Sequence, residues 1–288
     1  MEIVKNRSTF IILLILITVV LSGCEGPYVD KIEKSIINVN KYNKVYEITE
    51  VLDEEQFNEY TKDDGSLFNR FIDFRHQLNN SSKFEFYAFA NNFLEIINNE
   101  IPETCIVNYG SQFMKDSNYE IDKESITATE AIQVSENFFT LFPLKITAGR
   151  SFESSDFDYQ NAETIPVILG KNYQEYFNLG DTFEGYYICE RKSFTVIGFT
   201  DDESYFYLSS NNQMTSYENY IIMPFECIKD DSNSARAILL QQICGFIESH
   251  ESRTSALHEI NECLTEVGLE GWIGSIIVNE KSLQDKID

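Results

Sequence analysis

The chain has 288 residues, and 43% of them are hydrophobic, including 22 phenylalanines and 16 tyrosines. So much apolar surface supports one large or two modest folded domains and excludes a disordered or collagen-like protein. Acidic residues outnumber basic ones by 47 to 22, and the net charge of −25 excludes nucleic acid as a partner because it repels phosphate backbones. The same field would concentrate cationic peptides, which are therefore a candidate ligand class.

The N-terminus is typical of a membrane-targeting segment. Basic residues precede an apolar run from Phe10 to Leu21. This run has the length of a signal-peptide core, whereas a membrane span needs about 20 residues. It ends in Leu-Ser-Gly-Cys, the pattern of a bacterial lipobox, in which Cys24 carries the lipid after cleavage. We favour this lipid anchor over the alternative, an uncleaved single-pass helix at about residues 8–26, and both place the protein at the cell membrane facing outward.

A charged stretch follows and predicts a stalk over residues 24–62, which would lift the folded part off the membrane. Gly65 ends it. Apolar residues then recur at helical spacing and predict an amphipathic helix that runs to about Asn79. Residues 83–89 alternate as a strand that is partly buried on both faces.

The central stretch of the chain predicts a short helix followed by a strand. Ser135 should cap a helix over Glu136–Leu141, because its hydroxyl can accept from the free amides of the first turn. Pro143 ends this helix. Leu144, Ile146 and Ala148 then alternate with polar residues, which indicates a half-buried strand.

A glycine–arginine turn comes directly after that strand. Gly149 would let the backbone turn sharply, and the Arg150 guanidinium should pair with the carboxylate of Asp156 or Asp158. We therefore expect Gly149, Arg150 and Asp156 to form a structural motif, with no catalytic part.

Strands dominate the rest of the sequence. We expect them at Ile165–Gly170, Tyr186–Cys189, Phe194–Thr200, Tyr220–Phe225, Leu239–Ile247 and Ile273–Val278. A short helix is expected at Asn172–Phe177 and an exposed loop at Asp201–Gln213. Near the C-terminus, an apolar stripe from Leu257 to Val267 predicts a helix that ends at Gly268.

This order of motifs resembles the extracytoplasmic, or periplasmic, core domain of MacB/FtsX-type ABC transporter permeases. The resemblance rests on Val134–Phe152, Pro166–Leu169, Tyr176–Phe177, Leu179–Asp181 and Phe194–Gly198. It is strong from Val134 to Thr200 and fainter from Lys83 to the C-terminus. It implies an α+β fold, in which a layered, porter-like β-α-β subdomain carries an inserted β-rich subdomain and is preceded by a membrane-targeting helix. It also implies a module that transmits conformational change between a cytosolic ATPase and the outer surface.

The elements and the resemblance together divide the chain. The expected parts are a signal or anchor segment at 1–23, the stalk at 24–62, the first half of the core domain at 63–152, the β-rich insertion at 153–235 and the second half of the core domain at 236–288.

The sequence carries no recognisable motif for catalysis, cofactor binding or metal binding. GxxxxGK[ST], GxGxxG and GxSxG are absent, so ATP, dinucleotides and the serine chemistry of α/β-hydrolases have no sequence basis. The six cysteines lack CxxC or Cys/His zinc spacing. We therefore expect no enzymatic activity, no cofactor and no metal site.

No second apolar run of comparable length follows the N-terminal one. The permeases of the resembling family continue into further membrane spans, so we expect that this chain is not a complete permease. We also expect it to depend on a multi-span permease and a separate cytosolic ATPase. Its role would be to transmit conformational change, or to bind a partner or a substrate such as an exported peptide or lipoprotein. Two alternatives stay open: a free-standing surface lipoprotein that binds peptides or a partner protein and, ranked last, an extracellular hydrolase.

Overall fold

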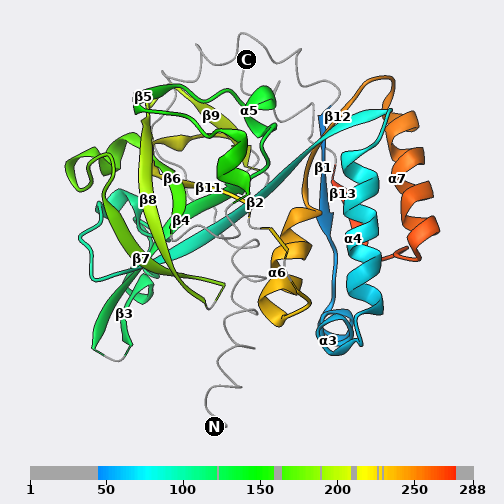
Figure 1. Ribbon diagram of the computed structural model, residues 1–288, viewed down its shortest axis with the longest axis horizontal. Coiled ribbons are helices and arrows are strands. Elements are labelled where there is room, and N and C mark those ends of the chain that lie inside the picture. Colours follow the sequence, from blue (N-terminus) through cyan, green and yellow to red (C-terminus); the bar gives the residue numbers. More distant parts are fainter. Residues whose placement is uncertain are drawn as a thin grey trace.

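The computed structural model describes residues 45–276, apart from 122, 159–163, 189, 209–212, 226 and 229. The chain forms an α+β structure of two subdomains joined by one long strand, β2 (Phe84–Ile97), as Figure 1 shows. This confirms the expected combination of a layered subdomain with a β-rich one. Within the described residues, no helix has both the length and the apolar composition required to cross a membrane.

The first subdomain places helices against a small antiparallel sheet. Its elements are β1 (Val45–Glu50), α3 (Glu54–Lys62), α4 (Ser66–Asn79), the start of β2, α6 (Asn233–Gln242), β12 (Gly245–Ser249), α7 (Arg253–Val267) and β13 (Ile273–Ile276). The strand order is β13-β1-β12-β2. The helices α4 and α7 lie side by side and bury Phe71, Phe74, Ile260 and Leu264 in one core (Figure 1).

The helix predictions for this subdomain are confirmed. Ser66–Asn79 is helical as the apolar spacing predicted, and it begins directly after Gly65, whose φ is 100°. The stripe near the C-terminus lies on α7, which ends at Gly268 in the left-handed conformation. A glycine is favoured at this position because it adopts positive φ without steric cost.

The stalk prediction is wrong for residues 45–62. The strand β1 is an inner strand that pairs with β12 on one side and β13 on the other, and Ile48 is fully buried. Asp53 caps the helix α3, because its carboxylate accepts from the Gln56 amide. The charged residues suggested a stalk because they lie on α3, a helix that exposes most of its surface and buries little besides Tyr60. Residues 24–44 of the expected stalk lie outside the described residues.

The second subdomain is built mainly of strands. They are the end of β2, β3 (Asn118–Ile121), β4 (Glu124–Val134), β5 (Ile146–Gly149), β6 (Ile165–Leu169), β7 (Thr182–Tyr187), β8 (Glu190–Thr200), β9 (Tyr205–Leu208), β10 (Gln213–Ser216) and β11 (Ile221–Pro224). The order β2-β7-β8-β6-β11-β4 closes on itself, because β4 also pairs with β2. Apolar side chains such as Leu94, Val167, Phe194 and Met223 form one core cluster of this subdomain.

A second layer covers the outside of this closed sheet. It consists of α5 (Phe138–Leu141) and the β9–β10 hairpin, and it forms a cluster in which Phe89, Phe138, Phe206 and Phe246 lie in ring contact. Short 3-10 helices at Glu103–Cys105, Met114–Ser117, Ser154–Phe157, Lys171–Glu175 and Tyr217–Asn219 complete the connections.

The β-rich subdomain is larger than the expected insertion at 153–235. It also includes the end of β2 and all of β3 and β4, which lie in the segment expected to be the first half of the core domain. The strand β4 could not be recognised from the sequence, because it has no regular alternation of apolar and polar residues. Thr127, Thr129 and Gln133 are buried there beside apolar residues.

Several local predictions are also wrong. Part of the loop expected at Asp201–Gln213 is strand β9, in which Phe206 is fully buried. The strand expected at Leu239–Ile247 begins only at Gly245, because the residues before it, up to Gln242, belong to the helix α6. Ser135 does not cap α5, since its hydroxyl donates to the Asn137 side chain and Asn137 occupies the cap position.

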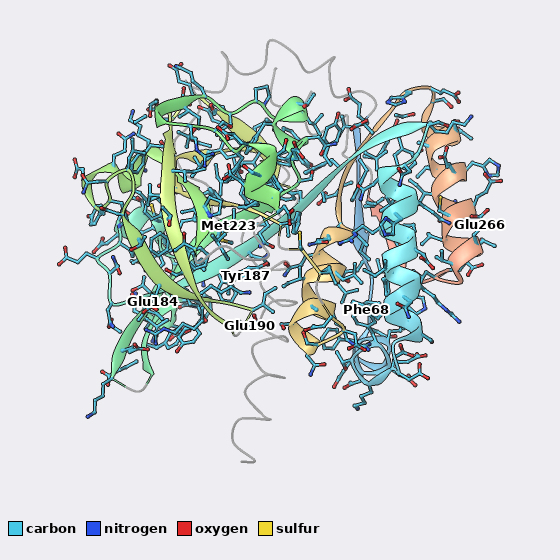
Figure 2. The ribbon with its side chains drawn as sticks, in the orientation of Figure 1. Phe68, Glu184, Tyr187, Glu190, Met223 and Glu266 are labelled. Atoms are coloured by element: carbon cyan, nitrogen blue, oxygen red, sulfur yellow. The ribbon has the colours of Figure 1, made fainter. Side chains whose placement is uncertain are left out.

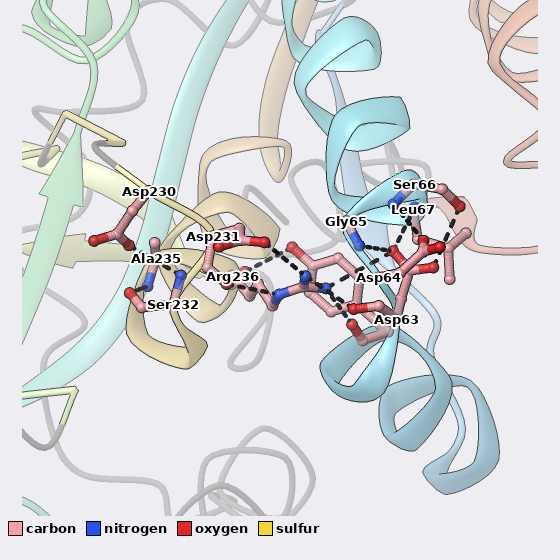
Figure 3. A network of polar contacts seen from close by, with 11 residues as sticks. Asp63, Asp64, Gly65, Ser66, Leu67, Asp230, Asp231, Ser232, Ala235 and Arg236 are labelled. Carbon is pink, nitrogen blue, oxygen red and sulfur yellow. Dashed lines mark hydrogen bonds and ion pairs between the residues drawn. The ribbon is translucent and has the colours of Figure 1, made fainter.

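A buried arginine fixes α6 against the turn between α3 and α4 (Figure 3). The Arg236 side chain is 4% exposed and donates to the carbonyl oxygens of Tyr60 at 2.6 Å, Asp63 at 3.2 Å and Asp231 at 2.9 Å. Its guanidinium carbon also lies 5.5 Å from the centres of the Tyr60 and Phe68 rings. A planar cation with several donors suits this position, because it satisfies carbonyl groups that no helix uses.

Candidate functional site at the junction of the two subdomains

The strand β2 joins the two subdomains without a break. Its first residues pair with β12, and from Phe89 onward it pairs with β4. At the change of partner, the Phe89 amide donates to the carbonyl of Cys244 and the Ser135 amide donates to the carbonyl of Ala88. The backbone groups of β2 therefore stay hydrogen-bonded through the junction.

Gly245 makes the close approach at this point sterically feasible. It has a φ of 145°, and a Cβ atom at this position would lie 2.2 Å from the Tyr87 carbonyl oxygen. Any side chain would therefore push β12 away from β2 where the two sheets meet.

A polar network lies across the junction. The Tyr187 hydroxyl on β7 is within hydrogen-bond distance of the side-chain amides of Gln133 on β4 and Gln241 on α6. The Asn92 side chain on β2 exchanges hydrogen bonds with the Gln241 side chain, at 3.2 and 3.3 Å. Tyr187 and Gln133 are each 2% exposed. Both subdomains thus contribute to a set of amide and hydroxyl groups that satisfy one another.

A second contact lies beside this network. Figure 2 places Tyr187 and Glu190 at the edge of the β-rich subdomain that faces α6. Burial raises the pKa of Glu190, but hydrogen bonds from Ser234 on α6 and from Lys192 outweigh burial, so the pKa lies below its usual value. Glu190 is therefore an ionised acceptor for the first turn of α6.

The helix α6 belongs to both cores. Ile238 packs into the interior of the closed sheet, while Leu239 and Leu240 pack into the core beneath α4 and α7. A helix shared in this way cannot move with one subdomain without disturbing the other. Together, β2, α6 and the polar network form the candidate site for conformational coupling.

The glycine–arginine turn lies away from this junction, between β5 and the Ser154–Phe157 turn. Gly149 has a φ of 76°, and a Cβ atom there would lie 2.2 Å from the Ile197 carbonyl oxygen. The Arg150 guanidinium binds the Asp156 carboxylate through two contacts of 2.5 and 3.0 Å, and Asp156 rather than Asp158 is the partner. Burial raises the Asp156 pKa, but the bonds from Arg150 and from the Glu153 amide outweigh it, so the pKa is lowered.

Two of the described cysteines have thiols of low reactivity. Cys105, Cys227, Cys244 and Cys263 are free thiols, and burial raises the pKa of Cys105 to about 11 and that of Cys244 to about 12. Both are therefore protonated at neutral pH. Among the described residues, no three His, Cys, Asp or Glu side chains are grouped to hold a metal ion. The expected anchor residue, Cys24, lies outside the described residues.

The junction residues were not predicted from the sequence. Asn92, Gln133, Tyr187 and Gln241 come from four different elements and meet only in the folded chain. One weak signal existed, the asparagine pair at 91–92 inside an otherwise apolar strand, where a polar side chain needs a partner.

Comparison with known proteins places these features in context. The model of the MacB-like periplasmic core domain matches residues 86–261, more than half of the chain. A comparison with curated protein sequences gives no match. The periplasmic region of MacB from Actinobacillus actinomycetemcomitans is 15% identical with a TM-score of 0.48, over 88% of this chain and 97% of that one. The extracellular domain of the noncanonic ABC-type transporter YknZ from Gram-positive bacteria is 10% identical with a TM-score of 0.43, over 81% and 99% of the two chains.

Proposed function

Because the chain belongs to the family of MacB-like periplasmic core domains, we propose that it transmits conformational change between the membrane and the outer parts of an ABC transporter. It does so without catalysis of its own. Its partners are a multi-span permease with a similar outer domain and, through that permease, a separate cytosolic ATPase. The membrane tether is the N-terminal segment, either lipidated at Cys24 or inserted as a helix at about 8–26.

The observation that carries this proposal is the position of the first and last described residues in the first sheet. Glu47 pairs with Ile276 and Val45 pairs with Glu248, so the described chain enters and leaves the first sheet at the same end. The strand β2 also starts at this end, because Phe84 pairs with Ser249. A tether at the N-terminus therefore pulls on the end of the sheet where β2 begins.

Force applied there has a continuous path to the β-rich subdomain. The strand β2 has 14 residues, so at about 3.3 Å per residue it is roughly 45 Å long, and its part from Phe89 to Ile97 lies in the second sheet. The polar network of Tyr187, Gln241 and Asn92 links it sideways to α6 and β7. Movement at the membrane end would thus reorient the β-rich subdomain as a body.

Crosslinking in the native membrane tests the proposal. A variant that lacks residues 165–225 is not a suitable control for this experiment, because the deletion would open the closed sheet and expose its core. Photoreactive residues should instead replace exposed apolar side chains at Tyr109, Phe113, Tyr176 and Val51. We expect capture of a permease with a similar outer domain from at least one of these positions. Capture of only the protein itself from all of them would favour the free-standing lipoprotein.

A further inference from the structure

The turn between β7 and β8 holds one residue in an unfavourable backbone conformation. Tyr187 pairs with Glu190, so two residues connect the strands, and the first of them, Ile188, has a φ of 47°. Connections of this length favour left-handed residues such as Asn and Gly. A β-branched residue is an outlier there, because the atoms on its Cβ crowd the backbone. The chain therefore has isoleucine where the turn by itself would favour another residue.

A second turn of the same length shows what a turn by itself requires. Ile121 pairs with Glu124 across the β3–β4 turn, in which Lys123 has a φ of 74°. Lys123 is exposed, whereas Ile188 is partly buried. The other non-glycine residues with positive φ that the structure describes are both asparagines, which adopt this conformation readily. Ile188 is thus the one β-branched residue with a left-handed backbone in the described part of the chain.

The surroundings of Ile188 account for this exception. Its side chain packs against the core cluster of the closed sheet, to which α6 also contributes a side chain. Polar contacts to α6 flank it in the sequence. The Tyr187 hydroxyl lies 2.6 Å from Oε1 of Gln241, and Glu190 accepts a hydrogen bond from Ser234. Figure 2 shows Tyr187 and Glu190 at the edge that faces α6. Ser234 and Gln241 lie about two helical turns apart, so the turn holds α6 near both of its ends.

We propose that Ile188 is a positioning residue, which fixes α6 against the β-rich subdomain. The unfavourable backbone conformation is retained because the packed side chain holds the two flanking polar contacts in place. This role deepens the proposed function and rests on it for its use in coupling, since α6 belongs to both cores. The positioning itself is a property of this chain alone, so its test can fail while the crosslinking succeeds, and the reverse.

Hydrogen exchange of the full chain in nanodiscs is the first test. Ile188→Asn relieves the backbone strain but removes the apolar side chain. We expect the α6 amides to exchange about tenfold faster, the factor that corresponds to the loss of a half-buried apolar side chain. The β7–β8 amides should exchange no faster than in the wild type, because relief of the left-handed conformation offsets the lost packing. Ile188→Val keeps a branched apolar side chain and should retain the wild-type exchange of α6.

Lys123→Asn is the matched control. It introduces the same residue at a left-handed position in a turn of the same length, but the β3–β4 turn lies away from α6 (Figure 1). The β3–β4 amides should exchange more slowly or at the wild-type rate. The exchange of α6 should not change.

The relative placement of the two subdomains gives a second readout. Nitroxide labels carried on p-acetylphenylalanine replace Tyr176 and His258, whose side chains are exposed and lie in different subdomains. Double electron–electron resonance measures the distribution of distances between the labels. We expect Ile188→Asn to broaden this distribution and Ile188→Val to leave it as in the wild type.

Three results would overturn the proposal. Unchanged exchange of α6 in Ile188→Asn would show that the turn does not position the helix. Faster exchange of all helices and strands by one common factor would show that Ile188 contributes only to the overall stability of the fold. A label distribution as narrow as that of the wild type would show that Ile188 does not set the placement of the subdomains.

Discussion

The Tyr187 hydroxyl lies 2.6 Å from Oε1 of Gln241, and this contact joins a strand of the β-rich subdomain to a helix of the layered one. Gln133 and Asn92 reach the same hydroxyl from two further strands. Apolar contacts alone tolerate small shifts, whereas hydrogen bonds require defined distances and angles. The network therefore selects one relative placement of the two subdomains.

Removing this hydroxyl should weaken the junction. We expect Tyr187→Phe to lower the free energy of unfolding by about 1 to 2 kcal/mol, because it leaves the buried Gln133 amide short of a partner. Urea denaturation measures the change. Tyr186→Phe on the opposite face of the same strand is the control and should stay within about 0.5 kcal/mol of the wild type. Equal losses in the two variants would show that the network adds nothing specific.

Two glycines separate backbone strain from steric clash. Gly149 and Gly180 have φ values of 76° and 85°, but only Gly149 has neighbours in the space that a Cβ atom would occupy. Gly180→Ala should cost about 1 to 2 kcal/mol for the left-handed conformation. Gly149→Ala should cost about 2 kcal/mol more, because the backbone at Ile197 must move. Thermal unfolding of both variants tests this, and similar melting temperatures would contradict it.

Glu130 should make stability depend on pH. Burial raises its pKa from an ordinary value of 4.5 to about 7. Below pH 4.5 both the folded and the unfolded chain hold the proton, so the group has no effect. As the pH rises toward 7, the unfolded chain ionises first and stability falls. We expect Glu130→Gln to raise the melting temperature above pH 7 and to leave it nearly unchanged below pH 4.5. The exposed Glu100→Gln should show no such trend.

Arg236 should tolerate neither an apolar side chain nor lysine. Arg236→Met leaves the carbonyl oxygens of Tyr60, Asp63 and Asp231 without their donor and should cost about 3 kcal/mol or more. Arg236→Lys should rescue little, because one ammonium cannot reproduce the planar fork. Arg70→Met is the control, since Arg70 is exposed and makes one contact of 3.4 Å to Gly268. Denaturant titration of the three variants would refute the prediction if the lysine variant matched the wild type.

The anchor prediction rests on the sequence alone. If Leu-Ser-Gly-Cys is a lipobox, Cys24→Ala should leave the precursor uncleaved and abolish labelling with a radioactive fatty acid, because the thiol is the acceptor. Mass spectrometry of the membrane fraction reads out both effects. A variant with unchanged mass and unchanged partitioning into detergent would support the uncleaved helix at about 8–26.

Regular periodicity is what made parts of this fold predictable. The helices α4 and α7 have an apolar stripe and a glycine at one end, and β6 and β8 are short runs of β-branched and aromatic residues. These signals are local, so the sequence shows them directly. The partner of Arg150 could also be predicted as one of two aspartates, because Asp156 and Asp158 follow it closely in the sequence.

What could not be predicted depends on distant contacts. The strand β1 becomes recognisable only when β12 and β13, some 200 residues later, cover its two edges. The network of Asn92, Gln133, Tyr187 and Gln241 consists of ordinary polar residues, and each becomes significant only through the other three. Sequence patterns report burial and periodicity but not which polar groups will meet.

Because two sheets share β2, the order of synthesis poses a problem for folding. The first half of this strand pairs with β12, which is synthesised much later, since Phe84 pairs with Ser249, 165 residues further along the chain. Until then Phe84, Phe86 and Ala88 form an apolar edge without its final neighbour. Long-range pairings of this kind fold slowly and leave strands open to aggregation. We therefore expect the unfinished chain to be prone to aggregation from the time β2 emerges until β12 has been made.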